Sequence, residues 1–401
     1  MTLIHVLIVG TLGILAGASK TDVATNVAAK SVITTEHAIH AGLDFLLRSQ
    51  NSDGSWGGAG DSLTTWSGPT WSNPESHRAW KVATTGLCVM ALLEAGETEE
   101  AIKAEKHGLE YLLANTDVKR PSEWDTMNVW AHAYGLQALA EAHAHSRYCF
   151  SPLRPKIRQA GNEHARRLAM CQSVHGGWGY LEFTPPRTRR PQWGTSFTTA
   201  TALYALVEAR EQGFDIDQGV LKRAVRIVHH CRLPNGGYTY HVRVIPNLHS
   251  EYIDQVKGSL SRIQVCLVAL EAAGEDITVK QFRTGLGHFF RDHRFLDIAR
   301  LKPVPHESFY ATSGYFYLYG HYYAALAIEH LLPEDREILW PMLQREIIKL
   351  QGKDGSIWDY DMHQYDKPYG VAFGVMALSR SIRDSDATLT GAPVPTAETT
   401  P

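Results

Sequence analysis

Carboxylic acids placed just before apolar helical segments are the residues of this chain best suited to proton transfer. Asp125 precedes one such segment, and Asp359 and Asp361 precede another. A carboxyl group at the mouth of a dry pocket can act as a general acid or a general base. The structural alternative is a helix N-cap for Asp125 and a solvated turn for Asp359 and Asp361.

Aromatic and imidazole side chains form a second candidate group, because most tryptophans lie in or beside the segments that also contain the acids. Aromatic faces suit isoprenoid chains and carbocations, and they would equally suit stacking against sugar rings. The predicted ligand-binding residues are Trp66, Trp71, Trp130, His132, Tyr134, Trp193, His306, Tyr310, His321, Tyr322, His363 and Asp366.

The histidines in this group have two interpretations. His132 and His321 fall inside apolar helical segments, where an imidazole is costly without a partner, so a core role is the default for each. His306 and His363 fall in connecting segments and are freer to meet a ligand. A metal site of His306, His363 and Asp361 can be drawn, but no HxxxH or HExxH spacing supports it. We predict neither a metal nor a cofactor.

Four segments repeat one pattern of a glycine turn followed by an aromatic ring. They are Gln50–Trp56, Gln172–Trp178, Cys231–Tyr238 and Gln351–Trp358. Each follows a helix-like run, which predicts a glycine-capped helix C-terminus with the ring packed back on the helix. Trp56, Trp178 and Trp358 are the rings expected to pack in this way.

Helical segments of two kinds alternate along the chain. One kind is small and apolar on nearly every side, which predicts helices buried all round, near 83–95, 127–142, 196–211, 260–273, 313–331 and 368–381. The other kind is amphipathic, near 35–50, 100–115, 156–172, 218–231, 279–292 and 335–350. Inner and outer helices in this alternation predict an all-α fold, the (α/α)6 toroid.

The connections between these helices are unequal in length. Those from an inner helix to the next outer helix are mostly short. Those from an outer to an inner helix are long, at 51–82, 173–195, 232–259, 293–312 and 351–367. In a toroid the long connections gather over the N-termini of the inner helices, so we expect the functional site at that rim.

The two ends of the chain differ in composition from the helical part. Residues 1–18 are apolar and end in Ala16-Gly17-Ala18, which predicts a signal peptide, with an uncleaved membrane anchor as the alternative. A linker at 19–34, a single toroid domain at 35–382 and a disordered tail at 383–401 complete the expected organisation. A signal peptide implies export to the periplasm or the cell envelope.

Composition narrows the range of partners. A net charge of -3 with 44% hydrophobic residues indicates a soluble globular protein that offers no basic surface to nucleic acid. The five cysteines form no CxxC pair and are expected to be small buried residues. The sequence does not determine the oligomeric state.

The Gln-to-Trp repeats at Gln50–Trp56, Gln172–Trp178 and Gln351–Trp358 resemble those of the prenyltransferase and squalene oxidase repeat family, which includes squalene-hopene cyclases and protein prenyltransferase β-subunits. The segments 129–141 and 319–325 look closest to single-toroid bacterial members that carry an export signal. The resemblance covers roughly residues 35–382. It implies the toroid, a small hydrophobic ligand of isoprenoid type and peripheral contact with a membrane.

The catalytic motifs of that family are not reproduced. Squalene-hopene cyclases protonate an alkene with the middle acid of an Asp-x-Asp-Asp motif. The nearest string here, Asp215–Gln218, lacks the last acid and is expected to cap an outer helix. Protein prenyltransferases bind zinc through an Asp-x-Cys pair and a distant His, whereas Cys266 is preceded by Gln264.

Three functions remain open from the sequence. The first is a terpenoid-cyclase-like isomerase or lyase, or an isoprenoid-binding protein. The second is a glycan-active (α/α)6 hydrolase or lyase, with Asp125 and Asp361 about 5 to 9.5 Å apart across a cleft. The third is a non-catalytic scaffold. A closed apolar centre with one desolvated acid favours the terpenoid function. An open groove with two opposed carboxylates favours the glycan-active enzyme, and a filled centre favours the scaffold.

Overall fold

The computed structural model describes residues 33–61, 74–118, 129–180, 191, 193–242 and 252–390, with side chains as far as Asp384. Residues from Thr34 onward form a unit distinct from the segment before them. Trp66, Trp71, Asp125 and the predicted signal peptide lie outside the described residues. No helix in the described part of the chain is both long enough and apolar enough to cross a membrane.

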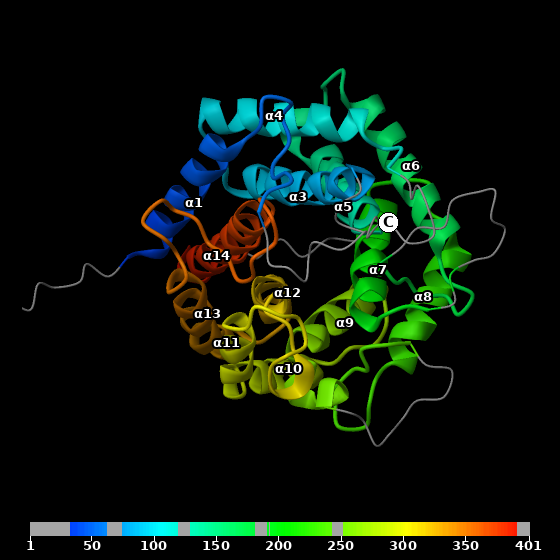
Figure 1. The fold of residues 1–401 in the computed structure, drawn as a ribbon, viewed down its shortest axis with the longest axis vertical. Coiled ribbons are helices and arrows are strands. Elements are labelled where there is room, and N and C mark those ends of the chain that lie inside the picture. The colour runs from blue at the N-terminus through cyan, green and yellow to red at the C-terminus, as the bar shows by residue number, and fades with distance from the viewer. Residues whose placement is uncertain are drawn as a thin grey trace, which may run out of the picture. The chain divides into compact units, whose positions relative to one another are not determined.

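The inner layer is a closed ring of helices (Figure 1). Its members are α3 (Pro74–Ala95), α5 (Val129–Ala144), α7 (Ser196–Glu211), α9 (Leu260–Ala272), α12 (Phe316–Glu329) and α14 (Asp366–Thr390). Each packs against the next, and α14 packs back against α3. Most described side chains of these helices are buried, because small and apolar residues cover most sides of each helix.

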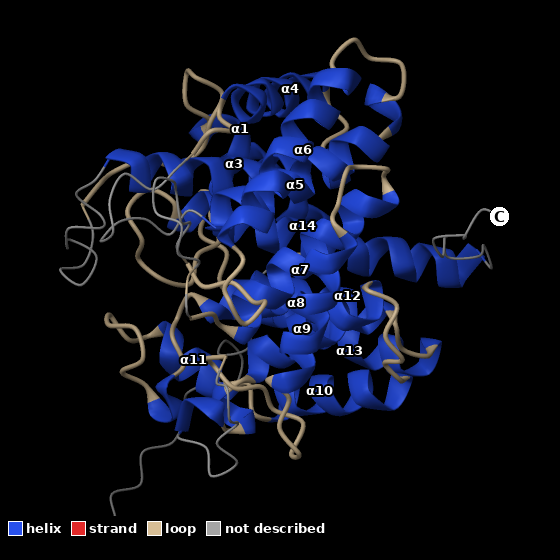
Figure 2. Cartoon of the chain, turned by 90° about the vertical axis from the view of Figure 1, so that its right-hand side faces the viewer, coloured by secondary structure: helices blue, strands red, loops and turns tan. Residues whose placement is uncertain are grey.

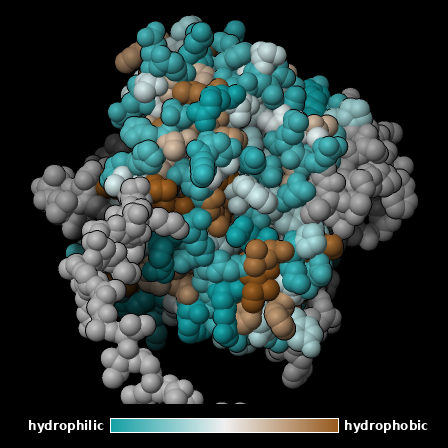
Figure 3. Space-filling view, turned by 60° about the vertical axis from the view of Figure 1, so that its left-hand side comes forward, coloured by the Kyte–Doolittle hydropathy of each residue, from teal (hydrophilic) through white to brown (hydrophobic). Residues whose placement is uncertain are grey.

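The outer layer consists of amphipathic helices, each packed on an inner helix. Its members are α1 (Thr35–Ser49), α4 (Glu99–Ala114), α6 (Arg154–Cys171), α8 (Gln218–His230), α10 (Val279–Arg291) and α13 (Pro333–Ile348). The molecular face drawn in Figure 3 is mainly hydrophilic with small hydrophobic patches, as expected for the solvent side of such helices. The predicted (α/α)6 toroid is confirmed.

Three helices differ from their expected bounds or were not expected. α3 begins already at Pro74, because proline suits the first helical position and Glu75 suits the positive end of the helix dipole. α14 continues to Thr390, past the domain end expected at 382. Asp384 holds it to α13, since its carboxylate accepts a hydrogen bond from Trp340 Nε1 at 2.7 Å. A short helix, α11 (Arg294–Arg300), lies in the connection after α10.

The glycine turns tie three helices together, as the turn after α6 shows. Gln172 is fully buried, and its Nε2 donates to a carbonyl of its own turn at 2.8 Å and to the carbonyl of Val220 in α8 at 3.0 Å. Trp178 Nε1 donates to the carbonyl of Leu168 in α6 at 2.8 Å, and its backbone N–H donates to Thr199 Oγ1 in α7 at 3.0 Å. The turn thus joins the preceding outer helix, the following inner helix and the next outer helix.

The same amide contact closes the outer layer. Gln50 Nε2 donates to the carbonyl of Ala104 in α4 at 2.8 Å. Gln351, after the last outer helix, donates through Nε2 to the carbonyl of Ala38 in α1 at 2.8 Å. The end of the fold is thereby bound to its beginning by the interaction that joins α1 to α4.

The fourth turn packs differently from the prediction. The turn glycines with positive φ are Gly54, Gly176, Gly236 and Gly355. Counted from these glycines, Ile357 occupies the position of Trp56 and Trp178. Ile357 is fully buried, whereas Trp358 is 39% exposed. The prediction that Trp358 packs on the helix is therefore wrong, because distance from the glycine decides which side chain faces the interior.

The described parts of the long connections gather at one end of the ring, over the N-termini of the inner helices (Figure 2). The expected cap of α8 is present at the N-terminus of that helix, where the Asp217 carboxylate accepts a hydrogen bond from the backbone N–H of Gly219 at 2.6 Å. All five cysteines are free, and four of them are buried.

Two glycines distinguish the cost of a left-handed backbone from the cost of a steric clash with a neighbouring helix. Gly236 has φ +85° with nothing within 4 Å of an added Cβ, whereas at Gly355, with φ +81°, a Cβ would lie 2.1 Å from the carbonyl oxygen of Ala41 in α1. We expect Gly236→Ala to lower the free energy of unfolding by about 1–2 kcal/mol and Gly355→Ala by clearly more. Urea unfolding of both variants measures the difference, and equal losses would contradict the close contact between this turn and α1.

Candidate functional site

A cavity of about 250 Å³ opens among the inner helices at the rim where the long connections lie. Its wall comes from α3, α5, α7, α12 and α14 and from the connections between them. The lining residues are Trp80, Ala83, Thr84, Leu87, Trp130, Tyr134, Tyr180, Phe197, Tyr240, Pro305, His306, Tyr315, Phe316, Tyr319, Met362, Tyr369 and Phe373. None of these described residues is a carboxylic acid, and most are aromatic.

The aromatic rings of the wall hold one another in place. Trp130 stacks on Tyr134 with ring centroids 5.8 Å apart, and on Phe197 at 6.0 Å. Phe197 in turn meets Phe316 edge to face at 5.0 Å. Contacts of this kind fix ring orientations, so the cavity has a preformed shape.

The hydroxyl groups of the wall are mostly satisfied by protein partners. Tyr180 and Tyr240 share a hydrogen bond between their hydroxyls. The hydroxyl of Tyr319 lies 2.9 Å from Thr201 Oγ1. Burial raises the pKa of Tyr180 and of Tyr319 well above the ordinary value, so both phenols stay neutral. The wall therefore presents ring carbon rather than free polar groups.

Asp359 lies directly behind this wall and is fully buried. One carboxylate oxygen accepts a hydrogen bond from Tyr369, a lining residue, at 2.8 Å, and the other accepts from the backbone N–H of Leu318 in the first turn of α12 at 2.8 Å. Burial raises the pKa of Asp359 to about 7, although both hydrogen bonds lower it. Asp359 is therefore a weaker acid than an ordinary aspartic acid.

A buried cation, Arg262 of α9, also lies behind the wall. Its guanidinium donates to the carbonyls of Gly258 at 2.9 Å and Tyr238 at 3.2 Å. It lies 5.4 Å from the ring centroid of Tyr240 and 6.0 Å from that of Phe316, and burial lowers its pKa. The faces of these two rings thus already interact with a positive charge.

The structure brings Trp130, Tyr134 and His306 to the cavity. The other predicted residues of the inner helices lie elsewhere. His132 faces the outer layer, where its Nδ1 lies 3.1 Å from Nδ1 of His164 in α6. Tyr322 lies deeper in the ring and accepts a hydrogen bond from Gln137 Nε2 at 3.3 Å.

His321 also faces the outer layer rather than the cavity. Its Nε2 lies 3.1 Å from Nε2 of His293, and its Nδ1 donates to the carbonyl of Tyr317 at 2.7 Å. Burial and the neighbouring His293 lower the pKa of His321 well below the ordinary value, so the ring is neutral. His132 and His321 thus both have the partnered, buried positions that were the default interpretation.

The predicted residues of the connections divide between several places. Trp193 packs edge to face on Tyr180 at 5.1 Å, behind the lining ring. Tyr310 packs on Phe295 at 4.8 Å, away from the cavity. Asp361 is half-buried and does not line the cavity.

A second pocket of about 370 Å³ lies beside α1 and the N-terminus of α14. His363 and Asp366 line it, and His363 Nδ1 donates to the carbonyl of Gly60 at 2.8 Å. Burial raises the pKa of Asp366 to about 6. His306 lines the cavity instead, so in the described part of the chain His306, His363 and Asp361 do not converge on a metal.

Several lining residues were missed by the sequence argument, although the repeats hold a signal for two of them. Tyr180 follows Trp178 by two positions, and Tyr240 follows Tyr238 by two positions, so both stand at the same place after a glycine turn. Asp359 stands at the corresponding place after Ile357. Phe197, Phe316, Tyr369 and Phe373 lie on inner helices and show no such mark.

The chain matches no protein-family model and no curated protein. It is similar in structure to an α-1,6-mannanase, GH76A of Salegentibacter sp. HEL1_6, with a TM-score of 0.57, 10% identity and coverage of 88% of this chain and 100% of that chain. It is similar to the type II terpene cyclase MstE of Scytonema, with a TM-score of 0.51, 13% identity and coverage of 87% and 98%. It is also similar to a cellobiose 2-epimerase of Bacillus thermoamylovorans, with a TM-score of 0.53, 11% identity and coverage of 85% of this chain and 98% of that chain.

At these identities the likeness extends to the fold alone. The similar structures include enzymes with different substrates, a terpene cyclase and enzymes named for carbohydrates. Function therefore has to be argued from the side chains that face the centre of the ring. The chain thus shares the (α/α)6 toroid fold with these proteins.

Proposed function

We propose that this protein binds a hydrophobic ligand of isoprenoid type in the aromatic cavity. The observation that carries the proposal is the lining itself, which is mostly aromatic rings and contains no carboxylic acid among the described residues. Burial of apolar ligand surface against such a wall is favourable in proportion to the area removed from water. The cavity of about 250 Å³ exceeds the cavity of about 150 Å³ that holds benzene in an engineered protein, so it suits part of a prenyl chain or a small ring system.

Binding of a glycan is less well supported by this wall. A sugar needs polar partners for its hydroxyls, and the hydroxyls of Tyr180, Tyr240 and Tyr319 are occupied by protein partners. Glycoside hydrolysis also needs two carboxyl groups across the substrate. Asp359 is buried behind Tyr369 and Asp361 does not line the cavity.

Two observations favour binding over cyclisation. Protonation of an alkene requires an acid stronger than an ordinary carboxylic acid, whereas burial makes Asp359 a weaker one. A carbocation needs unoccupied ring faces, whereas Tyr240 and Phe316 lie beside the guanidinium of Arg262.

Ala83 provides a test of the cavity, because it is a small residue of α3 in the wall. We expect saturable quenching of tryptophan fluorescence on titration with farnesol, and no saturable change with α-1,6-mannotetraose. Ala83→Phe fills the cavity and should weaken farnesol binding at least tenfold, about 1.4 kcal/mol. Ala83→Ser leaves the cavity open and should bind as the wild type does.

Both Ala83 variants are first compared with the wild type by thermal unfolding. This control distinguishes a filled cavity from a misfolded protein as the cause of weaker binding. Equal affinity of the Ala83→Phe variant and the wild type would place the ligand elsewhere. Saturable binding of mannotetraose alone would favour the glycan alternative.

The pH dependence of stability tests the state of Asp359. The folded protein holds this proton up to about pH 7, whereas the unfolded chain loses it near the ordinary pKa of 3.8. The folded state therefore binds more protons between these values, and this residue lowers the free energy of unfolding as the pH rises from 4 to 7, by roughly 1.4 kcal/mol for each unit.

Asp359→Asn carries no such proton but keeps the size of the neutral side chain. We expect the stability of the wild type relative to Asp359→Asn to fall between pH 5 and pH 8, as measured by urea unfolding at each pH. Using the difference between the two proteins removes the contributions of Glu141 and Glu208, whose pKa values burial raises to about 8 and about 7. A difference that is constant over this pH range would show that Asp359 is ionised throughout.

A further inference from the structure

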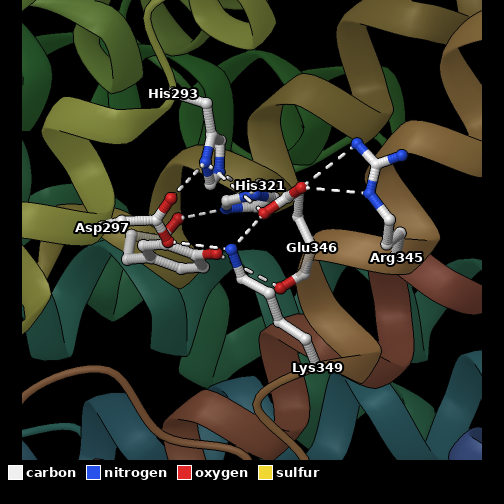
Figure 4. A network of polar contacts seen from close by, with 7 residues as sticks. His293, Asp297, His321, Arg345, Glu346 and Lys349 are labelled. Atoms are coloured by element: carbon white, nitrogen blue, oxygen red, sulfur yellow. Dashed lines mark hydrogen bonds and ion pairs between the residues drawn. The ribbon is translucent and has the colours of Figure 1, made fainter. Parts of the chain in front are cut away.

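A cluster of ionisable side chains lies outside the cavity, where α11 and α13 meet α12 (Figure 4). His293 precedes α11, Asp297 lies one turn later in α11, and Glu346 lies in the last turn of α13. His293 Nδ1 and one carboxylate oxygen from each acid lie within 4.8 Å of one another. The side chains of His293 and Glu346 are largely buried, whereas that of Asp297 is 36% exposed, so the cluster is open to solvent on one side.

Hydrogen bonds determine the tautomer of a neutral His293 ring, and therefore whether the nitrogen that faces the acids carries a hydrogen. A carbonyl can only accept, so His321 Nδ1 carries the hydrogen that it donates to Tyr317. Nε2 of the neutral His321 ring is then an acceptor, and the nitrogen that donates to it over 3.1 Å is Nε2 of His293. A neutral His293 consequently presents a lone pair on Nδ1 to Asp297 at 3.1 Å and to Glu346 at 3.5 Å.

Three groups of lone pairs cannot face one another without a positive charge between them. The ammonium of Lys349 together with a proton on His293 Nδ1 is one way to supply it, and a metal ion is another. The arrangement has the outer support that metal-binding histidines usually have, because the second nitrogen of His293 is held by His321 and that ring is held by the backbone.

We propose that His293, Asp297 and Glu346 bind a divalent transition metal ion, with Zn²⁺ as the reference ion. One imidazole and two carboxylates suit Zn²⁺ and its neighbours, whereas Ca²⁺ and Mg²⁺ prefer oxygen ligands alone. Three protein ligands leave a fourth position for water or another ligand. The site is separate from the aromatic cavity, and its existence does not depend on the ligand proposed for that cavity.

Lys349 is the competitor for this site. Its ammonium lies 2.8 Å from a carboxylate oxygen of Asp297 and also pairs with Glu346. Its side chain is 38% exposed, so it can move into solvent when an ion enters. When His293 Nδ1 carries a proton, one divalent ion displaces that proton and the ammonium, so two positive charges replace two.

The position of the site suggests what a bound ion would do. His293 and Asp297 begin the connection that leads to Pro305 and His306 in the cavity wall, and Glu346 belongs to outer helix α13. An ion would therefore fasten this connection to the outer layer. It would stabilise the folded protein in proportion to its concentration above the dissociation constant.

Calorimetric titration of the full chain with ZnCl₂ tests the site, with the visible absorption of Co²⁺ as a second readout of the ligands. We expect one equivalent of Zn²⁺ to bind to the wild type. Lys349→Met should bind it at least tenfold more tightly, because no ammonium competes. His293→Phe and, independently, Asp297→Asn should lose this equivalent.

His229→Phe is the matched control, because His229 is an exposed histidine that also pairs with an acid, Glu275. It should bind Zn²⁺ as the wild type does, which separates this site from weak binding by other histidines of the chain. Asp297→Asn guards against misfolding of His293→Phe, since Asp297 is partly exposed. Absence of stoichiometric binding in both the wild type and Lys349→Met, or binding unchanged in Asp297→Asn, would overturn the proposal.

Discussion

The side-chain amide of a glutamine just after an outer helix makes the interaction that fixes three pairs of neighbouring outer helices. Gln50, Gln172 and Gln351 each bond the backbone of the next outer helix, and Gln351 does so across the closure of the ring. Helices that pack only through apolar side chains can slide along one another, whereas a hydrogen bond to one backbone carbonyl fixes their relative height. Loss of such an amide would leave buried carbonyls without a partner, which costs more than one ordinary hydrogen bond.

The turn after α8 departs from this rule, and the departure affects the cavity. Arg232 stands where the other turns have glutamine, and a Cβ added at Gly236 would meet nothing within 4 Å. Arg262 holds this connection instead, through its hydrogen bond to the carbonyl of Tyr238. The same guanidinium lies 5.4 Å from the ring of Tyr240 in the cavity wall. Arg262 thus holds this connection in place and also places a positive charge behind the cavity wall.

The helices could be predicted because their pattern is local, whereas the site depends on contacts that are distant in sequence. The alternation of apolar and amphipathic segments was sufficient for both layers and for the rim. The apolar run around His321 predicted burial, but not its partner His293 from another connection. The acidity of Asp359 depends on burial and on Leu318 and Tyr369, which no spacing reveals. Trp358 is not the packed side chain of its turn, because Ile357 stands at the inward-facing distance from Gly355.

Asp359 and Arg262 hold segments of the rim in place, and the same two residues make the cavity less suited to cyclisation. Asp359 satisfies a backbone N–H in the first turn of α12, which otherwise has no partner within the helix, and this role keeps the carboxyl buried and weakly acidic. Arg262 holds its connection by occupying space beside two rings of the wall. A strong acid or an unoccupied ring face would require a different way of holding α12 or this connection. What remains at the centre of the ring is a rigid, apolar and preformed surface, and recognition of hydrophobic shape is the property that such a surface provides.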